Sequence, residues 1–224
     1  MTFSLVAHCA RTGQFGVAAV TGVPAVGKLL THAAAGVGAV ATQARVNPYL
    51  GIDGLKLLGL GLSAEAVRDA LLTTDPAIRF RQFAVIDRVG RTATFTGDAC
   101  LDWCGSLQRD GFSVQGNRLA GSQVLERTAD RFETLRDQPL ADRLLEALAE
   151  GVAAGGDAKG EVSATIYVMD TEDYPLWDIR VDDHPEPITE LRRLHDVFRD
   201  KVVPEIKSMP TRENPAGEEG EVPI

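Results

Sequence analysis

The sequence of 224 residues predicts an α+β fold in which two antiparallel sheets pack face to face and helices cover their outer sides. Short apolar segments follow one another through brief glycine-containing connections, which is typical of β-hairpins. The helical segments come in pairs after runs of strands, and this order differs from the regular strand–helix alternation of a parallel sheet. Segments 3–10 and 162–169 are apolar enough to be buried on both faces.

The first half of the chain is predicted to form three strands and then two helices. Strands 3–10 and 14–21 are joined by a short turn that contains Gly13. Strand 38–44 has small residues on both faces, which favours cover on both sides. A leucine-rich helix follows at 50–60, and Ser63 is suited to cap the next helix because its hydroxyl can accept a backbone N–H.

The second half is predicted to begin with strands and to end with a helix. Segments 83–87 and 91–95 form a hairpin around Val89-Gly90. Leucines at helical spacing and a following Gly-Gly pair define the helix at 140–154. The remaining elements are a strand at 112–115, a helix at 122–135, strands at 162–169 and 177–181, and a helix at 187–203 that starts at a proline.

The chain is expected to hold a single domain at residues 1–203 and an acidic Gly/Pro-rich C-terminal tail at 204–224. We interpret the tail as a mobile segment or as an arm that docks on a partner subunit. A hydrophobic fraction of 44% with such a tail after a long helix favours a homodimer, with the last helix or the tail at the interface.

Composition excludes several classes of partner. The 23 Lys and Arg residues against 32 Asp and Glu residues give a net charge of −9, whereas nucleic acids and anionic membranes attract clustered positive charge. No 18-residue apolar window is present, so no membrane association is expected. The start of the chain lacks a basic region followed by an apolar stretch, and the three cysteines are an odd number, so we expect a cytoplasmic protein.

The familiar cofactor and metal motifs are missing or incomplete. Cys100 and Cys104 are spaced C-x3-C without a second ligand pair, which favours free thiols over a zinc site. Gly22 and Gly27-Lys28 have the spacing of a phosphate-binding loop, but Leu29 stands where a hydroxyl residue is needed to hold magnesium. We therefore expect no cofactor and no metal, and a small molecule as substrate.

The first residues suggest a catalytic chemistry that needs neither a cofactor nor a metal. Thr2 follows Met1, and a small second residue permits removal of the initiator methionine. An N-terminal threonine contains both nucleophile and base, because its hydroxyl attacks while its α-amine, with a pKa of about 7.7–8.0, takes the proton. Met-Thr alone is a weak signal, because in most chains that begin with these two residues the N-terminus has no catalytic role.

Six ordered motifs make the chain resemble one bacterial family. They are TFSLVA at the start, GVGAVATQARVNP at 36–48, FTGDAC at 95–100, VQGNRLAG at 114–121, AGGDAKGEVSA at 154–164 and DIRVDDHPEPITELRRL at 178–194. The family is known as domain of unknown function 1028, and the resemblance covers roughly residues 2–200. It implies a four-layer αββα sandwich like that of the N-terminal-nucleophile (Ntn) hydrolases, and with it the hydrolysis of amide bonds.

The resemblance also implies roles for matched positions. Thr2 is expected to be the catalytic nucleophile and Asn117 the donor to the oxyanion of a tetrahedral intermediate. Substrate binding is expected from Gln43, Asn47, Arg180 and His184, with Arg180 suited to a carboxylate. Supporting roles fall to Ser4, Asp157 and Ser163. For His184 with Asp182 and Asp183, cation binding and capping of the last helix remain alternatives.

Two classes of function therefore follow from the sequence. The first is a hydrolase of a small non-peptide amide, acylamino acid or ureido compound that uses an N-terminal Thr2. The second is a non-catalytic, ligand-binding or oligomeric member of the same fold. Removal of Met1 separates them, because only a free amine on Thr2 can act as the base.

Overall fold

The strands of the protein form two antiparallel sheets, as seen in a computed structural model that describes residues 2–157 and 159–218. The larger sheet has the strand order β10 (Pro175–Val181), β9 (Ser163–Met169), β2 (Phe15–Thr21), β1 (Thr2–His8), β8 (Phe112–Asn117) and β7 (Gly105–Arg109). The smaller sheet has the order β3 (Thr31–Ala34), β4 (Gly38–Ala44), β5 (Arg81–Asp87) and β6 (Thr92–Thr96).

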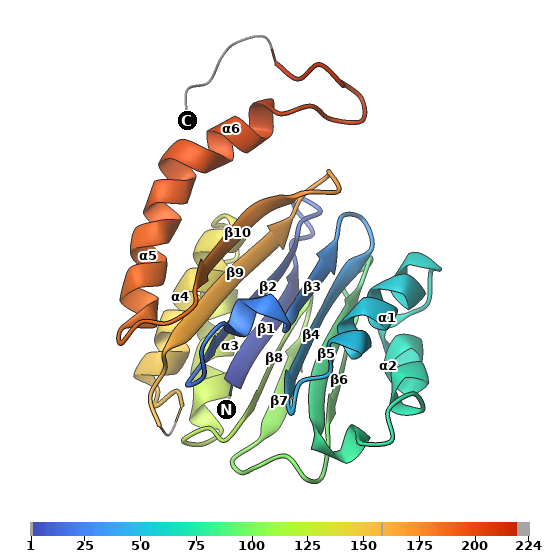
Figure 1. Cartoon of the computed structure of the whole chain (residues 1–224), viewed down its shortest axis with the longest axis vertical. Helices are drawn as coiled ribbons and strands as arrows, with labels where there is room; N and C mark the ends of the chain where they lie inside the picture. The colour runs from blue at the N-terminus through green and yellow to red at the C-terminus, as the bar shows by residue number, and fades with distance from the viewer. Residues whose placement is uncertain (1, 158, 219–224) are drawn as a thin grey trace.

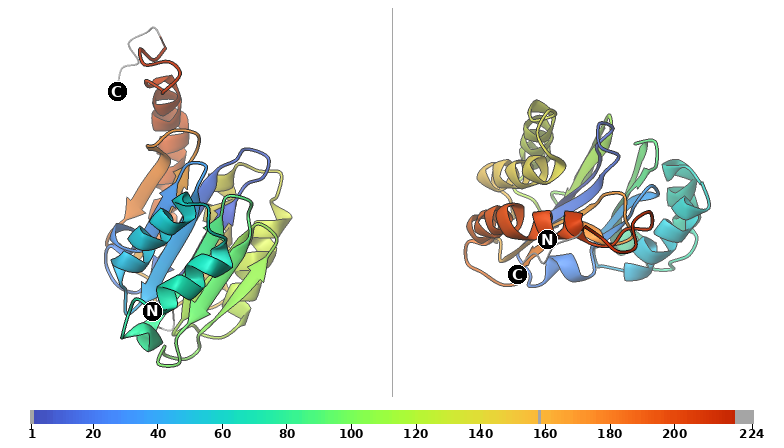
Figure 2. Two further views of the ribbon diagram at one scale, coloured as in Figure 1. Left: turned by 90° about the vertical axis from the view of Figure 1, so that its right-hand side faces the viewer. Right: turned by 90° about the horizontal axis from the view of Figure 1, so that it is seen from above.

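Helices cover the outer face of each sheet, which gives the four-layer αββα sandwich that was predicted (Figures 1 and 2). Helices α1 (Pro48–Gly59) and α2 (Ala64–Leu72) pack on the smaller sheet. On the larger sheet lie α3 (Gln123–Thr134), α4 (Leu140–Ala153) and α5 (Pro187–Val197). A third apolar cluster fills the space between the two sheets.

Capping residues set where the helices of the smaller sheet begin. The Ser63 hydroxyl accepts the Ala66 N–H at 3.3 Å, so the predicted cap of α2 is confirmed. The Asn47 side chain accepts the Tyr49 N–H at 3.1 Å and starts α1, with Pro48 in the favoured first-turn position.

Strand β1 is central in the larger sheet, with β2 on one side and β8 on the other, and this agrees with the prediction that segment 3–10 is buried on both faces. Its residues from Thr2 to Ala7 are all buried. Because side chains alternate along a strand, Phe3 and Leu5 belong to the core beneath the helices, whereas Val6 belongs to the core between the sheets. Thr2 and Ser4 share the inward face with Val6.

Two strands and part of a helix differ from the sequence prediction. The short strand β3 was missed because its four residues, THAA, are half-buried and include no large apolar side chain, and β7 was missed because it is an edge strand with alternate exposed positions. The last helix continues past 203: a π-helical turn, Phe198–Val202, leads into α6 (Val203–Ser208), which extends beyond the sandwich (Figure 1). The domain boundary at 203 stays a prediction, and residues 219–224 of the predicted tail lie outside the described residues.

The layer between the two sheets is apolar at one end and polar at the other. The apolar end is filled by side chains such as Val6, Val17 and Ile86. At the polar end, Gln43 of β4 and Gln82 of β5 are paired in register in the smaller sheet. They face Ser4 of β1, which hydrogen-bonds Gln43 across the layer.

A directional chain of hydrogen bonds satisfies these buried polar groups. It starts at Ser113, whose hydroxyl donates to Gln115 Oε1 at 3.1 Å, and Gln115 Nε2 donates to Ser4 Oγ at 2.6 Å. Ser4 Oγ donates to Gln43 Oε1 at 2.6 Å, and Gln43 Nε2 donates to Gln82 Oε1 at 2.8 Å. Gln82 Nε2 then donates to the Gly116 carbonyl at 2.8 Å and to Thr96 Oγ1 at 2.9 Å. The chain of bonds joins β8, β1, β4, β5 and β6, and we call it the amide network.

In the described part of the chain, none of the helices combines the length and the apolar character that a membrane span requires.

The amide network predicts a stability loss for Ser4→Ala. The change leaves Gln43 Oε1 and Gln115 Nε2 without their shared partner, and a buried polar group without a partner costs about 1–3 kcal/mol. We expect the free energy of unfolding, measured by urea denaturation, to fall by about 2 kcal/mol. Ser106→Ala is the matched control, because Ser106 pairs with Gln115 in register but is exposed on β7, and it should change stability by less than about 0.5 kcal/mol. Equal effects of the two changes would contradict the network.

Candidate active site at the start of strand β1

Thr2 lies at the polar end of the inter-sheet layer, in a row of hydrogen-bonding side chains that crosses the larger sheet. Its register partner on β8 is Asn117 and its partner on β2 is Thr21, which in turn pairs with Ser163 of β9. The Thr2 hydroxyl donates to Thr21 Oγ1 at 3.0 Å, and Thr2 is only 8% exposed. Side chains of one register row share a face of the sheet, so the fold brings Thr2, Asn117 and Ser163 together, and their proposed roles stay predictions.

Asn117 is held by the amide network while part of its amide remains available. Its Nδ2 donates one hydrogen bond to Gln82 Oε1 at 3.0 Å. A primary amide carries two N–H donors, so a second donor is left beside Thr2. Gln43, in contrast, is fully used: Nε2 reaches Gln82 Oε1, the Thr2 carbonyl at 3.4 Å and the Gln115 carbonyl at 3.3 Å. Gln43 therefore fixes the backbone at Thr2.

The two predicted supporting residues hold the segment that follows β2. Ser163 Oγ donates to the Val23 carbonyl at 2.7 Å and accepts the Val26 N–H at 3.1 Å. The carboxylate of Asp157 accepts the Gly22 N–H at 2.9 Å. An added Cβ at Gly22 would lie 2.6 Å from that carboxylate, so only glycine fits there. Both residues hold the 22–26 segment as a wall next to Thr2.

Two cavities flank the start of β1 and share Ala44. The first, of about 170 Å³, is the Thr2 cavity, and it is bounded by Thr2, Gln43 and the 23–26 segment. The second, of about 330 Å³, is the Arg118 cavity. Its lining residues are Ala44, Arg45, Phe80, Ala99, Cys100, Leu101, Asn117 and Arg118. A volume of about 300–1,000 Å³ is usual for small-molecule sites.

Backbone strain is concentrated around these cavities. Among the described residues, the non-glycine positions with positive φ are Ala25 at 62°, Ala44 at 68° and Arg118 at 57°. All three line one or both of the cavities. A left-handed conformation costs a non-glycine residue about 1–3 kcal/mol, and such residues cluster where a site requires a particular geometry. The strain therefore makes this end of the sandwich the candidate functional site.

A buried ion pair supports the turn after β4. Asp75 accepts hydrogen bonds from Arg81 Nε at 2.8 Å and from Asn47 Nδ2 at 2.7 Å. Arg81 also donates to the Arg45 carbonyl, so the pair holds the backbone on the rim of the Arg118 cavity. Burial by itself raises the pKa of Asp75, but the hydrogen bonds from Arg81, Asn47 and the Ala77 N–H lower it, and the pKa lies below its ordinary value.

The structure does not bring all the predicted binding residues to the cavities. Asn47 caps α1 and bonds Asp75. Arg180 is exposed on the edge strand β10, lies against Gly27, and is separated from β1 by strands β9 and β2. The His184 ring accepts the Glu186 N–H at 3.0 Å at the start of α5, which is a capping contact. None of these three residues lines the Thr2 cavity or the Arg118 cavity.

Sequence reasoning missed several residues that the site depends on. Gln82 and Gln115 are the junctions of the amide network, and Thr21 is the partner of the Thr2 hydroxyl. A signal for Gln82 was present: it alternates with Ala84 and Ile86 on one face of its strand, so it had to point inward. A second signal was that a buried Gln43 requires a hydrogen-bond partner, which Gln82 can supply.

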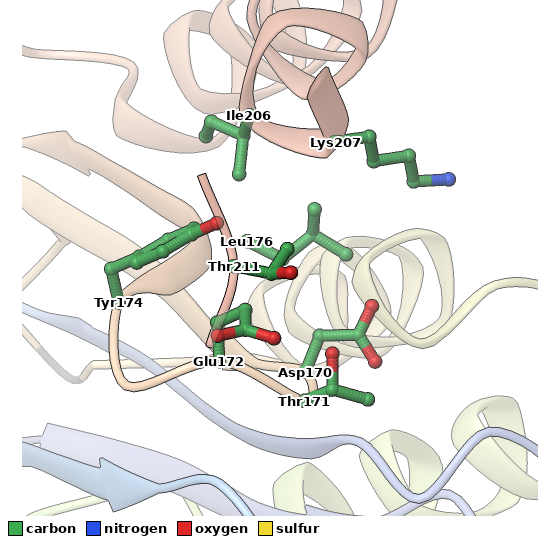
Figure 3. A pocket seen from close by; sticks show the side chains of 8 residues that line it. All are labelled: Asp170, Thr171, Glu172, Tyr174, Leu176, Ile206, Lys207 and Thr211. Atoms are coloured by element: carbon green, nitrogen blue, oxygen red, sulfur yellow. The ribbon is translucent and has the colours of Figure 1, made fainter. Parts of the chain in front are cut away.

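A further cavity, of about 130 Å³, lies at the other end of the larger sheet, between the β9–β10 hairpin and α6 (Figure 3). Tyr174 and Leu176 approach it from the hairpin, and Ile206 from α6. The hairpin end of β9 pairs with the end of β2 near Phe15, at the opposite end of the strands from Thr2. None of the residues predicted for catalysis or binding borders it.

Comparison with known proteins places the chain in a family. A family model described as "Family of unknown function (DUF1028)" matches residues 2–191, and the chain belongs to this family. The crystal structure of protein SPO2555 from Silicibacter pomeroyi, also assigned to DUF1028, is 29% identical with a TM-score of 0.90, over 98% of this chain and 97% of that chain. No curated protein matches the chain.

A second solved structure is far less similar. Anbu (ancestral beta-subunit) from Yersinia bercovieri is 11% identical with a TM-score of 0.42, over 88% of this chain and 97% of that chain. This similarity is too low to carry an argument about fold or function. The family membership that the six motifs predicted is thus confirmed, and the case for an N-terminal nucleophile rests on the residues around Thr2.

The low pKa of Asp75 predicts a pH-dependent stability effect of Asp75→Asn. A carboxyl whose pKa is depressed by folding stabilises the protein fully above its ordinary pKa, and the contribution is lost as the pH falls through the depressed pKa. At pH 7 the free energy of unfolding of the variant should be about 2 kcal/mol lower than that of the parent protein, because charged hydrogen bonds are lost. The difference should stay constant down to about pH 5 and then shrink.

Urea unfolding of both proteins across this pH range is the measurement. Asp69→Asn is the control, because Asp69 is exposed and pairs with the neighbouring Arg68. A difference that grows as the pH falls would contradict the assignment.

Proposed function

We propose that the protein hydrolyses an amide bond of a small molecule, an acylamino acid or a ureido compound, with Thr2 as N-terminal nucleophile after removal of Met1. The observation that carries the proposal is the position of Thr2: it begins the central strand, borders a cavity and faces Asn117 in register. A residue that must present both hydroxyl and amine to a substrate has to lie at a strand end that opens into a cavity, as Thr2 does.

The reaction follows from these groups. In the structure the Thr2 hydroxyl donates to Thr21. As Oγ1 attacks the substrate carbonyl, the α-amine of Thr2 takes the hydroxyl proton. The second N–H of Asn117 Nδ2 stabilises the oxyanion of the tetrahedral intermediate. The protonated amine then gives its proton to the leaving nitrogen, and an ester on Oγ1 remains. Water, deprotonated by the same amine, hydrolyses the ester and restores Thr2.

The remaining site residues position Thr2 and the cavity walls. Gln43 and Ser4 hold β1 through the amide network. Asp157 and Ser163 hold the 22–26 segment. This arrangement suits a reaction in which the attacking hydroxyl must be held in an accurate position before the substrate binds, because proximity and orientation supply much of the rate enhancement.

The sequence-based alternative is a non-catalytic, ligand-binding or oligomeric member of the fold, and the same cavities suit a ligand. A homodimer and a cytoplasmic location also remain predictions. Light scattering at micromolar concentration tests the first of these, and a monomeric mass would contradict it.

The mechanism predicts that three changes damage turnover. Thr2→Ala should abolish hydrolysis of a small-amide substrate, because it removes the attacking hydroxyl. An N-terminal extension that blocks the Thr2 amine should lower the rate by about 10²–10⁴-fold, the usual contribution of a general base. Asn117→Ala should lower kcat by about 10²–10³-fold, as expected for one oxyanion donor. The measurement is steady-state turnover across a panel of amides, N-acyl amino acids and ureido compounds.

Thr2→Ser is the matched control, because it keeps both hydroxyl and amine and should retain most of the activity. Circular dichroism and urea unfolding show whether each variant keeps its fold. Wild-type turnover by the N-terminally extended protein would rule out the N-terminal nucleophile. Absence of turnover in Met1-free protein across the whole panel would favour the non-catalytic alternative.

A further inference from the structure

The Arg118 cavity carries two positive charges beside Asn117. Arg118 follows Asn117 directly and is half-buried, and Arg45 approaches from the turn after β4. Within the parts of the chain that the structure describes, neither guanidinium has a carboxylate within 4.0 Å. Phe80 and Leu101 add apolar surface to the same cavity. The cavity thus combines an apolar wall with cationic groups that the protein itself leaves unpaired.

Two neighbouring guanidinium groups without a carboxylate partner among the described residues are unusual in so acidic a chain, whose net charge is −9. The neighbouring arginines are already neutralised: Arg79 pairs with Asp98 at 3.3 Å, and Arg81 pairs with Asp75 at 2.8 Å. Asp98 and Asp75, two carboxylates near the cavity, are thus paired with Arg79 and Arg81 and not with Arg45 or Arg118. A half-buried arginine without an acidic partner is more costly than a paired one, unless a ligand supplies the charge.

Backbone hydrogen bonds fix where both arginine side chains start, and the guanidinium of Arg45 also lies over an aromatic ring. Arg118 is held in the left-handed conformation, with φ of 57°, by its N–H bond to the Leu101 carbonyl at 2.9 Å. The Arg45 N–H bonds the Phe80 carbonyl at 3.2 Å, and its guanidinium carbon lies 5.8 Å from the centre of the Phe80 ring. An arginine anchored in this way loses less conformational entropy when its guanidinium binds an anion than a fully mobile arginine does.

We propose that the Arg118 cavity binds a carboxylate of the substrate, so that the protein acts on anionic amides whose carboxylate lies a few bonds from the carbonyl that Thr2 attacks. The inference rests on the proposed function for the position of the carbonyl, which Asn117 sets. N-acyl amino acids and ureido acids have this layout. Their neutral counterparts lack the group that pairs with Arg45 and Arg118.

Binding to Thr2→Ala protein tests the inference without turnover. The probes are a set of N-acetyl amino acids and their C-terminal amides, which differ in charge but hardly in shape, with affinities measured by calorimetry or by NMR titration. We expect at least one acid to bind about 10–100-fold more tightly than its amide, as charged hydrogen bonds predict. The double change Arg45→Met with Arg118→Met should remove this preference, so that the acid and its amide bind the variant with equal affinity.

Two further variants sharpen the result. Arg136→Met is the control for overall charge, because Arg136 is exposed at the end of α3, far from both cavities, and should keep the preference. Arg180→Met tests the carboxylate site that the sequence predicted. Loss of the preference in Arg180→Met but not in the double variant would overturn the inference, and so would equal binding of acids and amides or binding of neither.

The two proposals fail in different ways. If acids bind selectively through Arg45 and Arg118 but the Met1-free parent hydrolyses no amide, the proposed hydrolysis is wrong and the anion site stands. If hydrolysis depends on Thr2 but is indifferent to the substrate carboxylate and to both arginines, the hydrolysis stands and the anion site is wrong.

Discussion

The structure depends on one constraint: a set of side-chain amides is buried between the two sheets, and every one of them needs a partner. Gln43, Gln82 and Gln115 meet this need only if β1, β4, β5 and β8 keep their observed register and spacing. A slip of one residue would turn each amide to the opposite face and leave its hydrogen bonds unmade. The apolar half of the inter-sheet layer tolerates a repacking of small side chains, whereas the amide half does not.

The same constraint places the chemistry. Two residues of the network also bond the start of β1 and its neighbour: Gln43 from the opposite sheet donates to the Thr2 carbonyl, and Gln82 accepts a hydrogen bond from Asn117. The rim around this rigid centre is strained, with left-handed residues at Ala25, Ala44 and Arg118. The buried network and the Asp75–Arg81 pair offset the cost of that strain. A stiff core thereby supports a rim shaped for a ligand.

The sequence predicted most of the fold and only part of the site, for a physical reason. Apolar strand patterns, the Ser63 cap and the hairpin turns are local signals, and with the order of the elements they predicted the two sheets, the outer helices and the burial of β1. Thr2, Asn117 and Ser163 lie in one register row of the larger sheet, and the sequence analysis proposed a role for each of them without placing them together. Arg180 and His184 looked equally suitable, but their distance from Thr2 depends on strand order, which local patterns do not encode. Gln82 was missed for a similar reason, since its hydrogen-bond partners come from four other strands, β4, β6, β7 and β8.

The most direct test of the account is covalent capture of the nucleophile. A β-lactone probe opens when a hydroxyl adds to its carbonyl, and it leaves the whole reagent as an ester whose position peptide mass spectrometry can locate. The account predicts one adduct, on Thr2, in protein whose intact mass shows that Met1 is absent, and no adduct in the N-terminally extended protein or in Thr2→Ala. Labelling of Ser4 or of another hydroxyl in the Met1-free protein, or equal labelling of Thr2 with its amine blocked, would contradict it.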